Sequence, residues 1–144
     1  MSNKPARGVA ILVLHQDKKR FAISRRVDES RAFYRYFQFP GGKVENGEMP
    51  ITAAMRELSE ETGLGLPEHR FVYLGFDLRE NEVTGCGGYE GHAFLVMLKA
   101  GEYLLDSEPE KQTAWTFLGR KAMGNLRMIP GLLEYADIVV EMHE

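Results

Sequence analysis

Apolar residues occur in short runs along the chain, separated by polar or glycine-rich turns. Runs that are rich in β-branched and aromatic side chains and bounded by turn residues are typical of β-strands. A polar turn at residues 16–19 separates the first two runs, and Pro40 with the glycines after it ends the third. The pattern predicts strands at residues 9–14, 21–24, 37–39, 71–78, 92–98 and 113–118.

Residues 50–62 have the spacing of a helix instead. Pro50 suits the first turn of a helix, and Gly63 is a natural terminator. Ile51, Met55 and Leu58 fall on one side of that helix and form its predicted core-facing stripe. A second helix is predicted near the end of the chain, at residues 132–140.

Together these elements predict an α/β domain with mixed sheets. A chain of 144 residues fits one domain, and no internal repeat, low-complexity tract or linker divides it. We therefore expect residues 1–144 to form a single domain. The glycine-rich segment at residues 85–88 is expected to be a hairpin tip or loop.

Composition and charge narrow the possible partners. The net charge of −3 provides no broad basic field, so long nucleic acid is not expected, whereas a small anionic substrate remains possible. The longest apolar run, residues 9–14, is too short to span a bilayer, so no membrane partner is expected. Cys86 is the only cysteine, which excludes an intramolecular disulfide and makes a cytoplasmic location the expectation. A monomer and a homodimer both remain open.

Three carboxylates share one face of the predicted helix at residues 50–62. At about 100° per residue, Glu61 falls about 40° and Glu60 about −60° from Glu57. Like charges one turn apart repel each other and destabilise the helix, and a bound cation would neutralise that repulsion. Oxygen ligands without cysteine or paired histidines suit Mg²⁺ or Mn²⁺ better than Zn²⁺. A solvated acidic helix face is the alternative interpretation of the cluster alone.

The wider pattern around this helix resembles the Nudix box, with every defined position matched over residues 42–64. The matching residues are Gly42, Glu48, Arg56-Glu57-Leu58, Glu60-Glu61 and Gly63-Leu64. The resemblance implies a strand–loop–helix–loop unit inside an α/β/α sandwich with a mixed central sheet. It also implies hydrolysis of a nucleoside diphosphate linked to another group.

The resemblance also implies roles for individual residues. Glu57, Glu60 and Glu61 would bind Mg²⁺, for which Mn²⁺ could substitute, and in the MutT-type branch the Gly41 carbonyl is a further ligand. Glu57 is the candidate for activating the attacking water. Arg56 would act in catalysis by orienting the carboxylates.

Segments outside the box resemble MutT-type nucleoside triphosphatases. The entry Phe39-Pro40-Gly41-Gly42-Lys43-Val44-Glu45 is similar to theirs, and Ser24-Arg25-Arg26 is similar to their threonine–arginine–arginine. An arginine pair can grip phosphate oxygens, and Arg26 is favoured over Arg25. Phe39 is expected in or beside the pocket floor, and Lys43 could meet a phosphate. A solvated pair at a strand end and a solvated lysine are the alternatives.

Two further candidates lie later in the chain. Residues 108–111 resemble a loop of Nudix triphosphatases in which a glutamate supplies a metal ligand or general base. Glu110 fits that place best and Glu108 second, with an acidic surface loop as the alternative. Asn125 lies in a region comparable to that of a base-contacting asparagine of the MutT-type branch, but the residues around it do not align clearly.

The sequence therefore predicts a MutT-like enzyme that acts on a small nucleotide. It would hydrolyse a nucleoside triphosphate, which could be standard, damaged or non-standard, to the monophosphate and pyrophosphate. The first alternative keeps the same residues but takes a dinucleoside polyphosphate, a nucleotide sugar or a capped RNA end. The second alternative is a Nudix module that senses a nucleotide without cleaving it. Such modules are expected to lose box carboxylates, and none is missing here.

Overall fold

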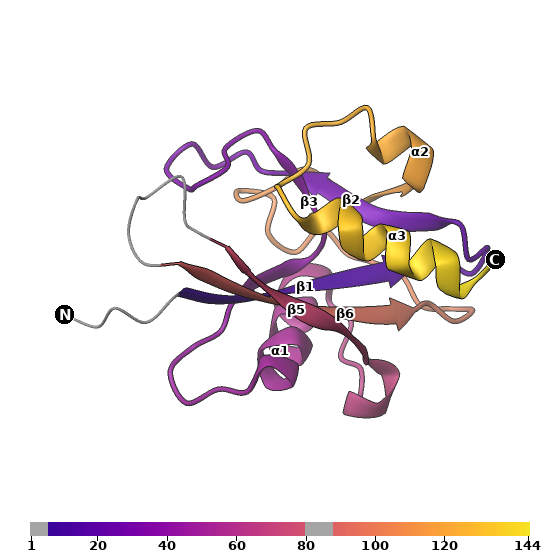
Figure 1. Ribbon diagram of the computed structural model, residues 1–144, viewed down its shortest axis with the longest axis horizontal. Coiled ribbons are helices and arrows are strands. Elements are labelled where there is room, and N and C mark those ends of the chain that lie inside the picture. The colour runs from indigo at the N-terminus through magenta and orange to yellow at the C-terminus, as the bar shows by residue number, and fades with distance from the viewer. Residues whose placement is uncertain (1–5, 80–87) are drawn as a thin grey trace.

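The computed structural model describes residues 6–79 and 88–144. In this part of the chain a mixed sheet is covered by helix α1 (Pro50–Thr62) on one face and by helix α3 (Leu132–Met142) on the other (Figure 1). This arrangement confirms the predicted α/β/α sandwich. The glycine-rich tip predicted at residues 85–88 lies, except for Gly88, outside the described residues.

Strand β1 (Ala6–Leu14) is at the centre of the sheet. It runs parallel to β6 (Tyr89–Met97), which in turn pairs antiparallel with β5 (Val72–Arg79). On its other side, β1 pairs with β4 (Gly41–Lys43) near its beginning and with β2 (Arg20–Arg25) at its end, through Leu14 and Phe21. The connection from β2 to β4 therefore starts and finishes beside the same strand.

Two short strands extend the sheet beyond β2. Strand β3 (Phe37–Gln38) and strand β7 (Thr116–Gly119) both pair antiparallel with β2. A 3₁₀ helix (Glu68–Arg70) precedes β5, and a short helix α2 (Arg120–Met123) follows β7. Because β3, β4, α2 and the 3₁₀ helix are four residues or fewer in length, they carry little hydrophobic periodicity, and only β3 among them was predicted.

Alternate residues of β1 supply two separate cores. Leu12 and Leu14 pack on the α3 side, whereas Ile11 and Val13 pack on the α1 side, and all four are fully buried. Period-2 alternation in a strand buried on both faces explains why residues 9–14 read as an unbroken apolar run. No helix within residues 6–79 and 88–144 has the length and apolar character needed to cross a membrane.

Helix α1 begins at Pro50 and ends at Thr62, as predicted, and Gly63 ends it with a positive φ of 79°. The predicted stripe packs against the core, with Leu58 fully buried and Ile51 and Met55 partly buried. The buried face is wider than predicted, because it also includes Glu61. The complete buried set is Ala53, Ala54, Leu58, Glu61 and Thr62. Small alanine side chains let the helix approach the sheet on its carboxylate side, so the acidic face is partly a packed face.

Candidate active site

Helix α1 and strand β4 together place two carboxylates against a glycine-rich backbone. The Gly41 N–H donates to Glu61 Oε2 at 3.3 Å. A Cβ added at Gly42 would collide with the Glu57 carboxylate. Only glycine therefore allows Glu57 to lie this close to β4. The two glycines of the strand explain how a helix carboxylate and a sheet backbone come into contact.

Glu61 is a buried carboxylate whose charge is not compensated. Glu61 is 5% exposed, and its side chain forms no ion pair within the described residues. Trp115 holds the backbone here, since its Nε1–H donates to the Glu61 carbonyl at 3.3 Å. Burial, followed by the negative charge of Glu57, raises the pKa of Glu61 to about 9. The environment thus disfavours the charged form unless a cation is present.

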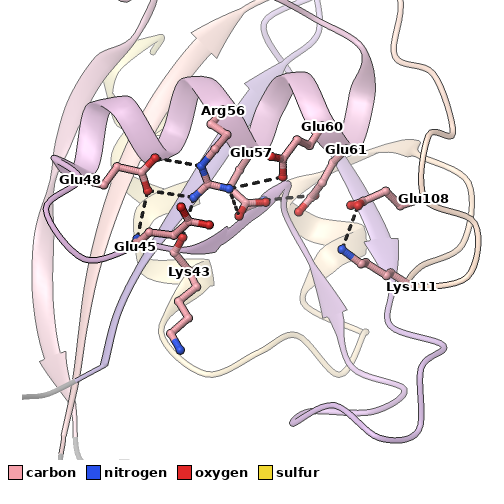
Figure 2. Close-up of polar contacts among 10 residues, drawn as sticks. Lys43, Glu45, Glu48, Arg56, Glu57, Glu60, Glu61, Glu108 and Lys111 are labelled. Carbon is pink, nitrogen blue, oxygen red and sulfur yellow. Dashed lines mark hydrogen bonds and ion pairs between the residues drawn. The ribbon is translucent and has the colours of Figure 1, made fainter.

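Arg56 links the other acidic residues of the helix (Figure 2). Its Nε and Nη2 donate to both carboxylate oxygens of Glu48 at 2.9 Å. Its Nη1 lies 3.0 Å from Glu57 Oε1 and 3.4 Å from Glu60 Oε2. Nη2 also donates to the Lys43 carbonyl at 2.9 Å. This forked set of contacts ties the helix to the loop and strand before it and fixes the directions of the carboxylates.

These contacts and the degree of burial separate the pKa values of the acidic residues. The Arg56 hydrogen bonds lower the pKa of Glu48 to about 2. Burial raises the pKa of Glu57 above its usual range, although the Arg56 hydrogen bond opposes that rise. The side chain of Glu60 is 50% exposed. Glu48 is therefore a firmly ionised anchor, whereas Glu57 and Glu61 hold protons more readily.

The loop after β6 brings a different glutamate to the site from the one favoured by sequence. Glu108 faces the end of the carboxylate row beside Glu61 in Figure 2, and its charge contributes to the raised pKa values of Glu57 and Glu61. Lys111 Nζ lies 2.8 Å from Glu108 Oε2. Glu110 is exposed and forms no side-chain hydrogen bond or ion pair with the rest of the described chain. The structure therefore favours Glu108 over Glu110.

Of the basic candidates for substrate binding, Arg26 is the one held within the fold. Its Nε donates to Gln38 Oε1 at 2.7 Å and its Nη1 to the Ala32 carbonyl at 2.8 Å. Arg25 and Lys43 are both exposed. The Lys43 side chain extends away from the carboxylate row in Figure 2.

The substrate contacts expected of Phe39 and Asn125 stay predictions, and the structure shows only where the two side chains lie. Phe39 was expected at the pocket floor, but it is 2% exposed and packs against Phe21 in the core on the α3 side. The reason is strand alternation, which turns Phe39 away from α1 and Gln38 toward it. Asn125 is exposed just after α2, and no side-chain hydrogen bond connects it to any other described residue.

Gln38 was not singled out in the sequence, although a signal for it exists. It is 7% exposed and lies opposite Ser24 in the β2–β3 pairing. A polar residue between Phe37 and Phe39 at strand spacing must face the opposite side from both aromatic rings. That side carries α1 and its carboxylates.

A divalent cation fits the chemistry of this site. Carboxylate and carbonyl oxygens suit a hard ion, and such an ion would stabilise the ionised form of the buried Glu61 carboxyl, whose pKa is raised to about 9. Within residues 6–79 and 88–144, no three acidic, histidine or cysteine side chains already converge as a metal site. Arg56 holds Glu57 and Glu60 in its own hydrogen bonds. Those hydrogen bonds use only Oε1 of Glu57 and Oε2 of Glu60, so the other oxygen of each carboxylate is left for an ion.

Comparison with known proteins gives a match over most of the chain. The NUDIX domain family model matches residues 4–124. Over 63 residues, the chain is 46% identical to an RNA pyrophosphohydrolase of Pelagibacter ubique, covering 43% of this chain and 37% of that protein. It is 32% identical over 78 residues to the 8-oxo-dGTP diphosphatase of Escherichia coli, covering 53% and 59% of the two chains. The matched segments thus span less than two thirds of each relative.

Solved structures share the whole fold at lower sequence identity. The MutT protein of Methanosarcina mazei superposes with a TM-score of 0.76, covering 100% of this chain and 99% of that one. Only 19% of the aligned residues are identical. The likeness shows a common fold.

Proposed function

The chain belongs to the NUDIX family, and on that premise we propose that it is a metal-dependent nucleotide pyrophosphohydrolase. Its substrate would be a nucleoside triphosphate, cleaved to the nucleoside monophosphate and pyrophosphate. The observation that carries this proposal is the buried Glu61, which forms no ion pair within the described residues and lies beside Glu57 on a helix whose other acidic side chains Arg56 orients. Residues 1–144 would form the single domain that carries this activity.

Mg²⁺, with Mn²⁺ as a substitute, would be held by Glu57, Glu60 and Glu61 and by the Gly41 carbonyl. Such an ion, when bound, neutralises charge on phosphate oxygens and on the departing group. Glu108 is the loop carboxylate placed to complete the site. The charge of Glu108 contributes to the raised pKa values of both Glu57 and Glu61.

Residues of the chain would activate the water, orient the carboxylates and bind the substrate. A water molecule attacks one phosphorus, the anhydride P–O bond breaks, and Glu57 accepts the proton that the water releases. Burial raises the pKa of Glu57 toward the range in which a general base is effective. Arg56 acts as a positioning residue, because its guanidinium fixes the carboxylates instead of facing outward. Arg26 would contact a substrate phosphate.

Two features of the relatives bear on the substrate. The Escherichia coli relative is an 8-oxo-dGTP diphosphatase, which supports a small, and even a damaged, nucleoside triphosphate. The Pelagibacter ubique relative is an RNA pyrophosphohydrolase, which makes the 5′ end of an RNA the second candidate. Both candidates require the same carboxylates and differ in what lies beyond the phosphates.

A substrate panel separates these candidates. Purified protein would be given standard deoxynucleoside triphosphates, 8-oxo-dGTP, a short 5′-triphosphorylated RNA, a dinucleoside polyphosphate and a nucleotide sugar, each with Mg²⁺, Mn²⁺ or EDTA. We expect monophosphate and pyrophosphate from a nucleoside triphosphate, with no turnover in EDTA. Preferential cleavage of the RNA end would favour the second candidate. Preference for a bridged substrate would contradict both.

A further inference from the structure

Arg26 differs from five other anchored arginines in what its side chain binds. Arg20, Arg56, Arg70, Arg79 and Arg120 each form an ion pair with an aspartate or glutamate. The two hydrogen bonds of Arg26 go to neutral oxygens, the side-chain amide of Gln38 and the carbonyl of Ala32. Among the residues described, no carboxylate pairs with Arg26. Its positive charge is therefore held in place without being neutralised.

The surroundings of Arg26 make an anion the expected partner. Burial is the main cause that lowers the pKa of its guanidinium, and the charge of Glu61 acts in the opposite direction. Arg26 therefore lies within electrostatic reach of the carboxylate site on α1. A guanidinium has five N–H donors, of which two are used here, so three remain for a ligand. A partly buried cation with free donors is well suited to phosphate oxygens.

Gln38 is the side chain that determines where this guanidinium lies. The backbone of β3 is fixed on both edges: Ser24 pairs with Gln38 on one side, and Phe37 exchanges hydrogen bonds of 2.8 and 2.9 Å with Arg127 and Ile129 on the other. The Gln38 side chain starts from that fixed strand and accepts the Arg26 Nε–H at 2.7 Å. Since the amide is neutral, it orients Arg26 and leaves the positive charge available.

We propose that Gln38 is a positioning residue for substrate binding, which holds the Arg26 guanidinium ready to contact a phosphate. The identity of the ligand in this inference rests on the proposed function. The contact by which Gln38 anchors Arg26 follows from the β2–β3 contacts alone. The proposal gives a role in the site to a residue outside the box at residues 42–64.

The test is a double-mutant cycle of Gln38→Met and Arg26→Ala, with Ser24→Ala as the matched control. The Ser24 hydroxyl is buried opposite Gln38 and has no hydrogen-bond partner among the described residues, so its loss removes no hydrogen bond to them. KM and kcat would be measured for the best substrate of the panel. The dissociation constant for inorganic tripolyphosphate with Mg²⁺ would be measured by calorimetry, and folding by thermal denaturation. Gln38→Asn, whose amide is one methylene shorter, replaces Gln38→Met if the methionine variant does not fold.

We expect Arg26→Ala to weaken tripolyphosphate binding and raise KM by about tenfold to a hundredfold, the range of a charge-assisted hydrogen bond. Gln38→Met should raise both by about fivefold with kcat nearly unchanged, and should add less than about twofold in the Arg26→Ala background. Ser24→Ala should match the wild type. An equal effect of Gln38→Met in both backgrounds, or none in either, would overturn the inference. A wild type that binds tripolyphosphate but cleaves nothing in the panel would refute the proposed function alone.

Discussion

Replacing Glu61 with glutamine removes the buried carboxyl group of α1 while keeping its shape. The unfolded chain releases the proton of this carboxyl near its ordinary pKa of 4.5, whereas the folded protein keeps it until about pH 9. Between these values the folded state binds more protons than the unfolded state, so the free energy of unfolding falls as pH rises. The stability contribution of Glu61 is complete below the unfolded pKa and is lost as pH approaches the folded pKa.

The size of this effect follows from the burial of the side chain. Glu61 is 5% exposed, so solvent screens its charge very little. One titrating group changes the free energy of unfolding by at most about 1.4 kcal/mol per pH unit. Between about pH 5.5 and about pH 8, the metal-free wild type should therefore lose up to about 3 kcal/mol more stability than Glu61→Gln. Millimolar Mg²⁺ should reduce this difference, because a cation favours the ionised carboxylate.

Urea denaturation of both proteins at several pH values, in EDTA and in Mg²⁺, measures this difference directly. The two proteins share all other titrating groups, so subtraction gives the contribution of Glu61 together with its coupling to Glu57. Parallel pH profiles of wild type and Glu61→Gln in EDTA would refute the claim that this carboxyl is buried without compensation. A difference that Mg²⁺ leaves unchanged would argue against Glu61 as a metal ligand.

Other variants test the neighbouring parts of the site. Gly42→Ala should lower kcat at least about tenfold, because the new Cβ displaces the Glu57 carboxylate. Gly65→Ala, where the added Cβ meets open space, should leave the steady-state kinetics unchanged. Arg56→Lys should lower kcat about tenfold in the same assay, since a lysine cannot reproduce the forked contacts to Glu48. Leu58→Ala should reduce the free energy of unfolding, measured by urea denaturation, by about 2–5 kcal/mol, because Leu58 is fully buried on the core-facing side of α1.

Strong local signals explain which elements could be predicted from the sequence. Helix α1 was predicted from Pro50 to Thr62 because proline, helical spacing and a terminating glycine coincide there. The central strands have long apolar runs that only two-sided burial explains. Strand β4, in contrast, consists of Gly41, Gly42 and Lys43, and backbone pairing with β1 creates it without any apolar pattern.

The positions of side chains at the site depended on contacts between distant segments. Phe39 could not be placed without knowing which face of β3 meets α3. The choice between Glu108 and Glu110 depends on how one loop turns toward α1. The buried face of α1 extends toward its carboxylates because strand β4, which it contacts, contains Gly41 and Gly42, and a helical pattern by itself does not reveal this contact.

The central claim is that the carboxylate row of α1 hydrolyses a nucleotide anhydride. The most direct measurement compares the products and kcat of wild type and Glu57→Gln on the best nucleoside triphosphate with Mg²⁺. Glu68→Gln, at an exposed glutamate in the 3₁₀ helix after α1, is the control. We predict monophosphate and pyrophosphate from the wild type and the control, and a kcat at least about a hundredfold lower for equally stable Glu57→Gln. Unchanged turnover by Glu57→Gln, or release of diphosphate and phosphate by the wild type, would contradict the account.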